Sequence, residues 1–235
     1  MFDTSSNSIP VVGRISSGVV PNTLIRRTLE FVQNELPGWR DDPLRPREDS
    51  EEKLNSQLCK YLNVASGQRF PMVYFHHEEK QTLNRRVDLS ALPRESQFIG
   101  TNFHSIYDPI AVFEGKRLPA PCGSSLRQQE YVTGGGNRSG GIQRFKLGLH
   151  GAKHRIAAIV GYLQEGDASH WINTINGWIV GLNSESAEER WTAEEQLSHV
   201  LNDLERGLSV CSSQHRRSGD VVSETIDLQH LWIKM

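Results

Sequence analysis

Residues 110–117, Ile-Ala-Val-Phe-Glu-Gly-Lys-Arg, predict a buried β-strand with a charged end. The apolar run that opens this stretch favours a strand inside a sheet. Side chains alternate between the two faces of a strand, so Glu114 and Lys116 project together. An acid and a lysine that share one face of a buried strand predict a chemical site at this point of the sheet.

A second acid lies in a similar setting upstream. Asp88 stands between Val87 and Leu89, where a carboxylate without a partner would be costly to bury. On a neighbouring strand, Asp88 would lie beside Glu114 and Lys116. Hydrolysis of a phosphodiester needs such groups, because Mg²⁺ prefers carboxylates and water, and a cation stabilises the developing charge. The alternative is that the two acids form surface ion pairs with nearby arginines, namely Arg85, Arg86 or Arg117.

The order of an acidic helix start (Glu51-Glu52), Asp88 and then Glu114-Gly115-Lys116 resembles the PD-(D/E)XK nuclease superfamily. The resemblance covers roughly residues 50–165. It implies an α/β fold of the restriction-endonuclease-like kind, with a mixed central sheet flanked by helices. It also implies a Mg²⁺-dependent deoxyribonuclease, in which Mn²⁺ can substitute, acting as an endonuclease in bacterial phage defence or restriction.

The resemblance also implies the roles of the site residues. Asp88 and Glu114 are expected to hold the metal, with the backbone carbonyl of Gly115 as a further ligand. Lys116 is expected to orient or deprotonate the attacking water, and Glu51 to assist. The sequence departs from the family pattern in two places: Val87 replaces the proline of the family name, and Gly115 stands where an apolar residue is commoner.

The helix acid is chosen by helical spacing. Glu51 lies on the same helical face as Leu54 and Leu58 and so points toward the sheet, whereas Glu52 points more toward solvent. Capping of the helix is the alternative role for either acid, because carboxylates stabilise the positive end of a helix.

Positive charge dominates the stretch that follows the site, between Lys116 and Arg155. We predict that Arg117, Arg144 and Lys146 contact a nucleic acid, with a plain solvated surface as the alternative. The glycine-rich stretch 134–141 predicts a flexible loop that orders on DNA.

The composition is that of a soluble globular protein: of 235 residues, 37% are hydrophobic and 23% are charged. One domain over residues 1–235 is expected, with its core at about 50–165, an N-terminal helical arm and a C-terminal helix-strand extension. The longest apolar run, Ile156 to Leu163, is too short to cross a membrane. Met1 to Pro10 lacks the pattern of a secretory signal, so we expect a cytoplasmic protein.

The expected elements follow hydrophobic periodicity and turn residues. Residues 1–20 are expected to form a loose arm, and Pro37-Gly38 to end the first helix. The polar stretch 76–85 fits a long hairpin connection. The helices are expected at 23–36, from 50 onward, at 141–150, 168–182 and 187–208, and the strands at 71–75, 86–92, 110–113, 156–163, 210–214 and 224–233.

Two further features have structural interpretations. His150 and His154 are four residues apart, but the Glu of the HExxH pattern is missing, so structural roles are expected for both. Trp171, Trp178 and Trp191 have helical spacings that suit the core or a dimer face.

Two other hypotheses about the function remain open. The chain could be a nuclease-like fold that binds nucleic acid or a partner without catalysis, or a subunit that a partner activates. DNA is the expected partner, and a homodimer or a larger defence complex is the expected assembly. The sequence does not decide whether the substrate is DNA or RNA, or whether it is a duplex or a single strand.

Overall fold

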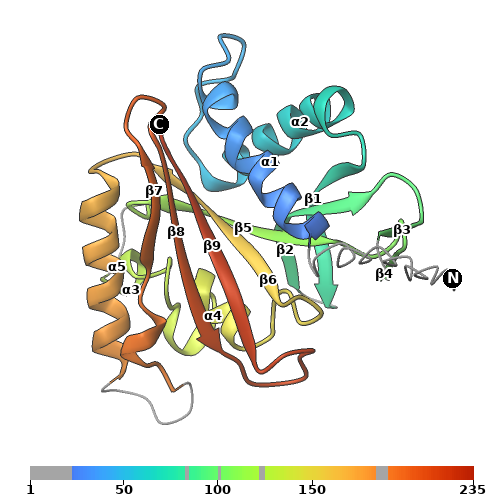
Figure 1. The fold of residues 1–235 in the computed structure, drawn as a ribbon. Helices are drawn as coiled ribbons and strands as arrows, with labels where there is room; N and C mark the ends of the chain where they lie inside the picture. Colours follow the sequence, from blue (N-terminus) through green and yellow to red (C-terminus); the bar gives the residue numbers. More distant parts are fainter. Residues whose placement is uncertain (1–22, 83–84, 100–101, 122–124, 184–189) are drawn as a thin grey trace, which may run out of the picture.

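The structure is a computed structural model that describes residues 23–82, 85–99, 102–121, 125–183 and 190–235 (Figure 1). The loose arm expected at 1–20 lies outside these residues. The strands are β1 (Val73–Thr82), β2 (Arg85–Pro93), β3 (Gln97–Ile99), β4 (Asn102–His104), β5 (Ala111–Leu118), β6 (Ile156–Leu163), β7 (Ser198–Asp203), β8 (Leu208–Arg216) and β9 (Thr225–Lys234).

One mixed sheet of seven strands runs through the molecule in the order β1-β2-β5-β6-β9-β8-β7. The central strands β5, β6 and β9 are parallel, and the outer pairs are antiparallel. Strands β3 and β4 form a separate hairpin. The predicted α/β class, with a mixed central sheet between helices, is confirmed.

Helices cover both faces of the sheet (Figure 1). Helices α1 and α2 pack on one face, and α4 and α5 pack on the other. Strand β6 shows why the centre is apolar, because all eight of its residues are buried and alternate between the two cores. The helices are α1 (Thr23–Arg40), α2 (Glu51–Arg69), α3 (Ser125–Gln128), α4 (Gly141–Lys146) and α5 (Ala168–Asn183), with short 3₁₀ turns η1 (Gly135–Asn137) and η2 (Ala193–Glu195).

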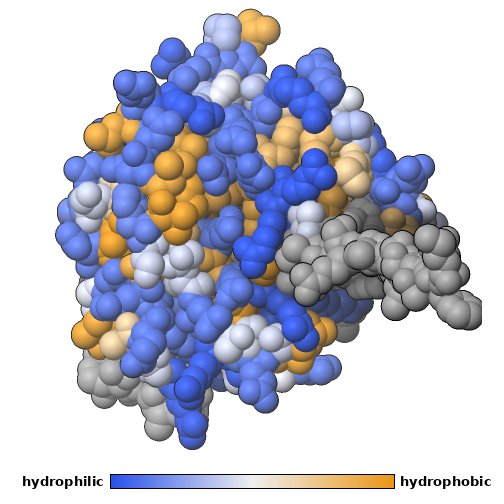
Figure 2. Space-filling view, in the orientation of Figure 1, coloured by the Kyte–Doolittle hydropathy of each residue, from blue (hydrophilic) through white to orange (hydrophobic). Residues whose placement is uncertain are grey.

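The helix predicted at 187–208 is wrong. Residues 187–189 lie outside the described part, and the rest forms η2, the edge strand β7 and the turns beside them, with no α-helix among the described residues 190–208. Apolar residues there recur at a helix-like spacing, but pairing with β8 through a tight turn at Gly207 (φ 60°) overrides this local pattern. Val200 and Leu201 stay exposed, and Figure 2 shows apolar side chains gathered on this face over β7 and β8.

Two smaller predictions also need correction, and one element was not predicted. Helix α1 continues through Pro37 to Arg40, because the buried ring of Trp39 packs in the core and offsets the hydrogen bond that proline cannot make. Residues 76–82 extend β1 and pair with β2, so this stretch is not a long connection. The hairpin β3–β4 was not predicted, since its strands are only three residues long each.

Two of the expected tryptophan positions are in the core. Trp171 and Trp191 are buried, and Trp178 packs against the same cluster. Among the described residues, no helix is both long and apolar enough to cross a membrane.

Candidate active site

The site lies where strands β2 and β5 separate. Their pairing is confined to Leu89–Ala91 of β2 and Ala111–Phe113 of β5. Beyond Phe113, β5 continues along β6 on its other side. The backbone of β5 that follows Phe113 therefore needs other partners on its β2 side.

Two carboxylates supply these partners. The backbone N–H of Gly115 donates to Oδ2 of Asp88 at 2.7 Å, and the N–H of Arg117 donates to Oε2 of Glu51 at 3.1 Å. Glu51 of α2 and Asp88 of β2 thus accept the backbone hydrogen bonds that continued pairing of β2 with β5 would have accepted. This explains locally why acids stand at both positions.

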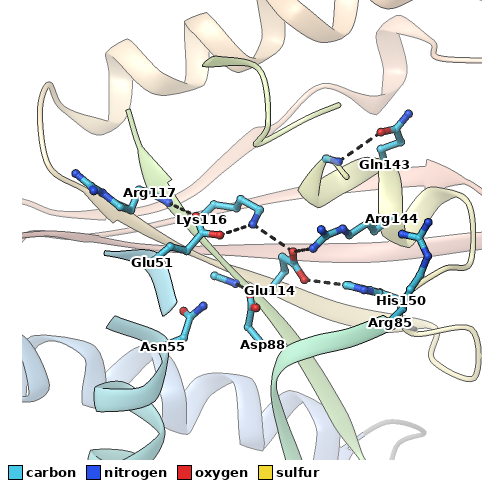
Figure 3. Close-up of polar contacts among 12 residues, drawn as sticks. Glu51, Asn55, Arg85, Asp88, Glu114, Lys116, Arg117, Gln143, Arg144 and His150 are labelled. Carbon is cyan, nitrogen blue, oxygen red and sulfur yellow. Dashed lines mark hydrogen bonds and ion pairs between the residues drawn. The ribbon is translucent and has the colours of Figure 1, made fainter. Parts of the chain in front are cut away.

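Lys116 is the centre of the cluster (Figure 3). Its Nζ lies 2.6 Å from Oε1 of Glu51 and 3.2 Å from Oε1 of Glu114. The N–H of Gly115 ties Asp88 to β5, and the charges of Glu114, Lys116 and Glu51 all act on its carboxylate. The structure therefore brings the four predicted residues together from α2, β2 and β5.

Glu114 is fully buried and has partners on both oxygens. Arg144 and Lys116 contact Oε1, and Nδ1 of His150 lies 3.0 Å from Oε2 (Figure 3). The alternative of a surface ion pair is wrong for Glu114. Arg86, one of the arginines considered for such a pair, contacts the exposed Glu78.

Arg144 and His150 are therefore site residues that the sequence analysis assigned elsewhere. It placed Arg144 among the nucleic-acid contacts and gave His150 a structural role. Both contact Glu114 from the opposite layer, because Arg144 lies on α4 and His150 lies just after it. His154, in contrast, bonds to the carbonyl of Pro109, in line with the expected structural role.

Glycine at position 115 has a steric cause. A Cβ atom there would lie 1.9 Å from Oδ1 of Asn55, which is buried on α2 and accepts a hydrogen bond from the hydroxyl of Tyr162 at 2.7 Å. An apolar residue, as the family pattern prefers, would not fit. Asn55 was missed, although it lies four residues after Glu51 and so on the same helical face.

The cluster changes the proton affinities of its members. Burial alone would raise the pKa of Glu114, but the positive charges of Lys116, His150 and Arg144 outweigh it and hold that pKa well below its usual value. Burial would lower the pKa of Lys116, and the carboxylates of Glu114, Glu51 and Asp88 raise it instead. Lys116 therefore stays protonated at neutral pH.

Asp88 behaves differently from Glu114. Burial, and then the carboxylate of Glu114, raise the pKa of Asp88 to about 7, against the opposing effect of Lys116 and of the Gly115 N–H. Negative charge at Asp88 is thus incompletely compensated by the protein itself. A bound cation would remove this deficit.

The donor set fits a hard divalent cation under one condition. Carboxylate oxygens of Asp88 and Glu114 are the ligands that Mg²⁺ prefers, and the N–H of Gly115 points to Asp88, so its carbonyl faces the same side. In the described part of the chain, however, no three His, Cys, Asp or Glu residues are grouped for metal binding. Both oxygens of Glu114 are engaged by Lys116, Arg144 and His150, so one of these partners must release Glu114 before a cation can use it.

The other two residues predicted to contact nucleic acid, Lys146 and Arg117, differ in their exposure to solvent. Lys146 is a correction: it is 2% exposed and its Nζ lies 2.5 Å from Oε1 of the equally buried Glu195, so it does not reach a surface ligand. Arg117 is partly exposed beside the site. The loop predicted at 134–141 contains η1, and Gly134 donates its N–H to Gln143, which Figure 3 shows near Arg144.

These contacts describe a cluster of three carboxylates, one lysine, one arginine and one histidine, in which Glu114, Lys116 and His150 are buried and Glu51, Asp88 and Arg144 are partly exposed. Comparison of the chain with protein-family models, with curated proteins and with solved structures found no match in any of the three.

Proposed function

We propose that this protein is a metal-dependent deoxyribonuclease that hydrolyses phosphodiester bonds of DNA. The observation that carries the proposal is the convergence of Glu51, Asp88 and Glu114 around Lys116 at the point where β2 leaves β5. The restriction-endonuclease-like fold and an endonucleolytic role in phage defence or restriction are parts of the same proposal.

Asp88 and Glu114 would hold Mg²⁺ or Mn²⁺, with the Gly115 carbonyl as a further ligand. Such an ion, when bound, supplies a water of lowered pKa and neutralises charge on the phosphate. Burial suits this chemistry, because electrostatic interactions are stronger where water is excluded.

Lys116 acts as a cation in this proposal. Since its pKa is raised by the surrounding carboxylates, it keeps its proton at neutral pH and can donate hydrogen bonds to a phosphate oxygen or to the attacking water. This favours orientation and charge stabilisation over the alternative role of proton acceptor. Glu51 positions the ammonium group through the 2.6 Å contact.

The second candidate is a nuclease-like fold that binds nucleic acid or a partner protein without cleaving. One observation favours it: every oxygen of Glu114 already has a cationic or histidine partner. Under that candidate, DNA binding is independent of divalent ions and unchanged by Glu114→Gln.

The test is cleavage of supercoiled plasmid DNA with Mg²⁺ or Mn²⁺ by the wild type and by Asp88→Asn and Lys116→Met. We expect each substitution to slow cleavage about 100-fold or more, as loss of a charge-stabilising group does in other enzymes. Glu51→Gln should slow it as well, with Glu52→Gln as the matched control, because Glu52 is the exposed neighbour on the same helix turn. Equal cleavage by the wild type and both site variants sinks the proposal.

The same assay addresses substrate and assembly. Linear product that appears together with nicked product indicates cuts in both strands, which a homodimer achieves with one site per protomer. Light scattering of the wild type checks that expectation. A parallel reaction contains an RNA of the same sequence. If only the RNA is cut, RNA and not DNA is the substrate.

A further inference from the structure

Glu114 is neutralised by the protein itself. It is fully buried, and three side chains meet its two oxygens: Lys116, Arg144 and His150. Asp88 on β2 has the Gly115 N–H on one oxygen. The positive charge of the cluster is therefore gathered on one of the two proposed metal ligands.

Of the three partners of Glu114, Arg144 is the least enclosed. Its side chain is 24% exposed, against 8% for Lys116 and 2% for His150. Lys116 is also held by Glu51. Among the described residues, the one side-chain hydrogen bond of Arg144 is to Glu114, and its Nε is buried without a partner. Of the three partners, Arg144 can thus leave Glu114 with the loss of the fewest contacts.

The backbone under Arg144 is firmly held. Lys146 on the same helix bonds to Glu195 and to the carbonyl of Arg216, and Arg217 donates to the carbonyls of Phe145 and Gly151. Departure of Arg144 from Glu114 therefore needs only a change of its own side-chain torsions. The helix α4 and His150 can stay in place.

We propose that Arg144 is a resident counter-ion that competes with the divalent cation for Glu114 and that turns to a DNA phosphate when the cation binds. This inference rests on the proposed function. It names Arg144 as the residue that couples occupation of the metal site to binding of the substrate. Arginine suits both partners, because its planar fork matches carboxylates and phosphates alike.

The first test is Mn²⁺ titration by calorimetry with the wild type, Arg144→Ala and the control Arg138→Ala, which removes an exposed arginine nearby. Removal of the competitor should tighten Mn²⁺ binding about 5- to 150-fold, the usual range of coupling between linked ligands. Arg138→Ala should bind Mn²⁺ as the wild type does. Equal or weaker binding by Arg144→Ala overturns the inference and leaves the proposed function standing. Absence of binding by every protein overturns both.

A second measurement uses the wild type alone, because Arg144→Ala leaves a buried carboxylate with fewer partners and can unfold. Modification by phenylglyoxal, read by mass spectrometry, should speed up at Arg144 when Mn²⁺ is added, by severalfold. Arg138 should react at the same rate with and without Mn²⁺. An unchanged rate at Arg144 in the presence of bound Mn²⁺ contradicts the inference.

Discussion

Replacement of Asp88 by Asn removes one partly buried carboxylate and keeps the acceptor for the Gly115 N–H, since an amide oxygen can take the same hydrogen bond. The pKa of Asp88 is raised from 3.8 to about 7, first by burial and then by Glu114. The fold therefore binds the Asp88 proton more tightly than the unfolded chain does. The stability that this group contributes is complete below the unfolded pKa and is lost as the pH rises through about 7.

The size of the effect follows from the shift. Each unit of pKa is worth about 1.4 kcal/mol, so the raised pKa of Asp88 lowers the free energy of unfolding, relative to strongly acidic pH, by at most about 4 kcal/mol at pH 8 and about 2 kcal/mol at pH 5. Asp88→Asn avoids both costs. Relative to the wild type, the variant should gain about 2 kcal/mol more at pH 8 than at pH 5, roughly 4–8 °C in Tm for a chain of this length.

The assay is calorimetric unfolding in EDTA at the two pH values. Asp108→Asn is the control, because the Asp108 side chain is 66% exposed and pairs at 3.9 Å with the exposed Lys153. Addition of Mn²⁺ at pH 8 should raise the Tm of the wild type and not that of Asp88→Asn. A Tm difference between Asp88→Asn and wild type that is the same at both pH values refutes the reasoning about buried charge.

Two substitutions test packing, one at Gly115 inside the site and one at Lys146 on the helix behind it. Gly115→Ala places Cβ 1.9 Å from Oδ1 of Asn55 and should destabilise the fold by about 1–3 kcal/mol, measured by denaturant unfolding. Adding Asn55→Ala should restore part of this stability. A double variant that is as unstable as Gly115→Ala would count against this contact. Lys146→Met removes the lysine partner of the buried Glu195, which keeps only His215 at 3.7 Å and backbone N–H groups among the described residues, and should cost up to about 3–5 kcal/mol. Lys146→Met with Glu195→Gln should recover part of this loss. A single variant as stable as the wild type would show that Lys146 is not buried as described.

The central strands and the acids on them could be predicted from sequence because burial on both faces leaves a strong local pattern. The run in β6 has that pattern along its whole length, and Glu114 and Lys116 are two residues apart on one strand. Spacing on one helix likewise selected Glu51 over Glu52, and only Glu51 contacts Lys116 in the structure.

The rest of the site depends on contacts between distant parts of the chain. Arg144 and His150 meet Glu114 from 30 and 36 residues away, across a loop whose path no local periodicity fixes. Lys146 has the same kind of sequence surroundings as Arg144, yet its partner Glu195 is 49 residues away and draws it into the core. Strand β7 was missed for a related reason, since pairing with β8 determines it.

The measurement that tests the central claim most directly is an anomalous difference map from crystals soaked in Mn²⁺. We predict one strong peak bound by the carboxylates of Asp88 and Glu114, with Lys116 within hydrogen-bonding reach of the water on the ion. In the same map, the Arg144 guanidinium should have left Glu114. A fully soaked crystal with no peak at these carboxylates, and with Arg144 still on Glu114, would contradict the assignment of this cluster as a metal-dependent nuclease site.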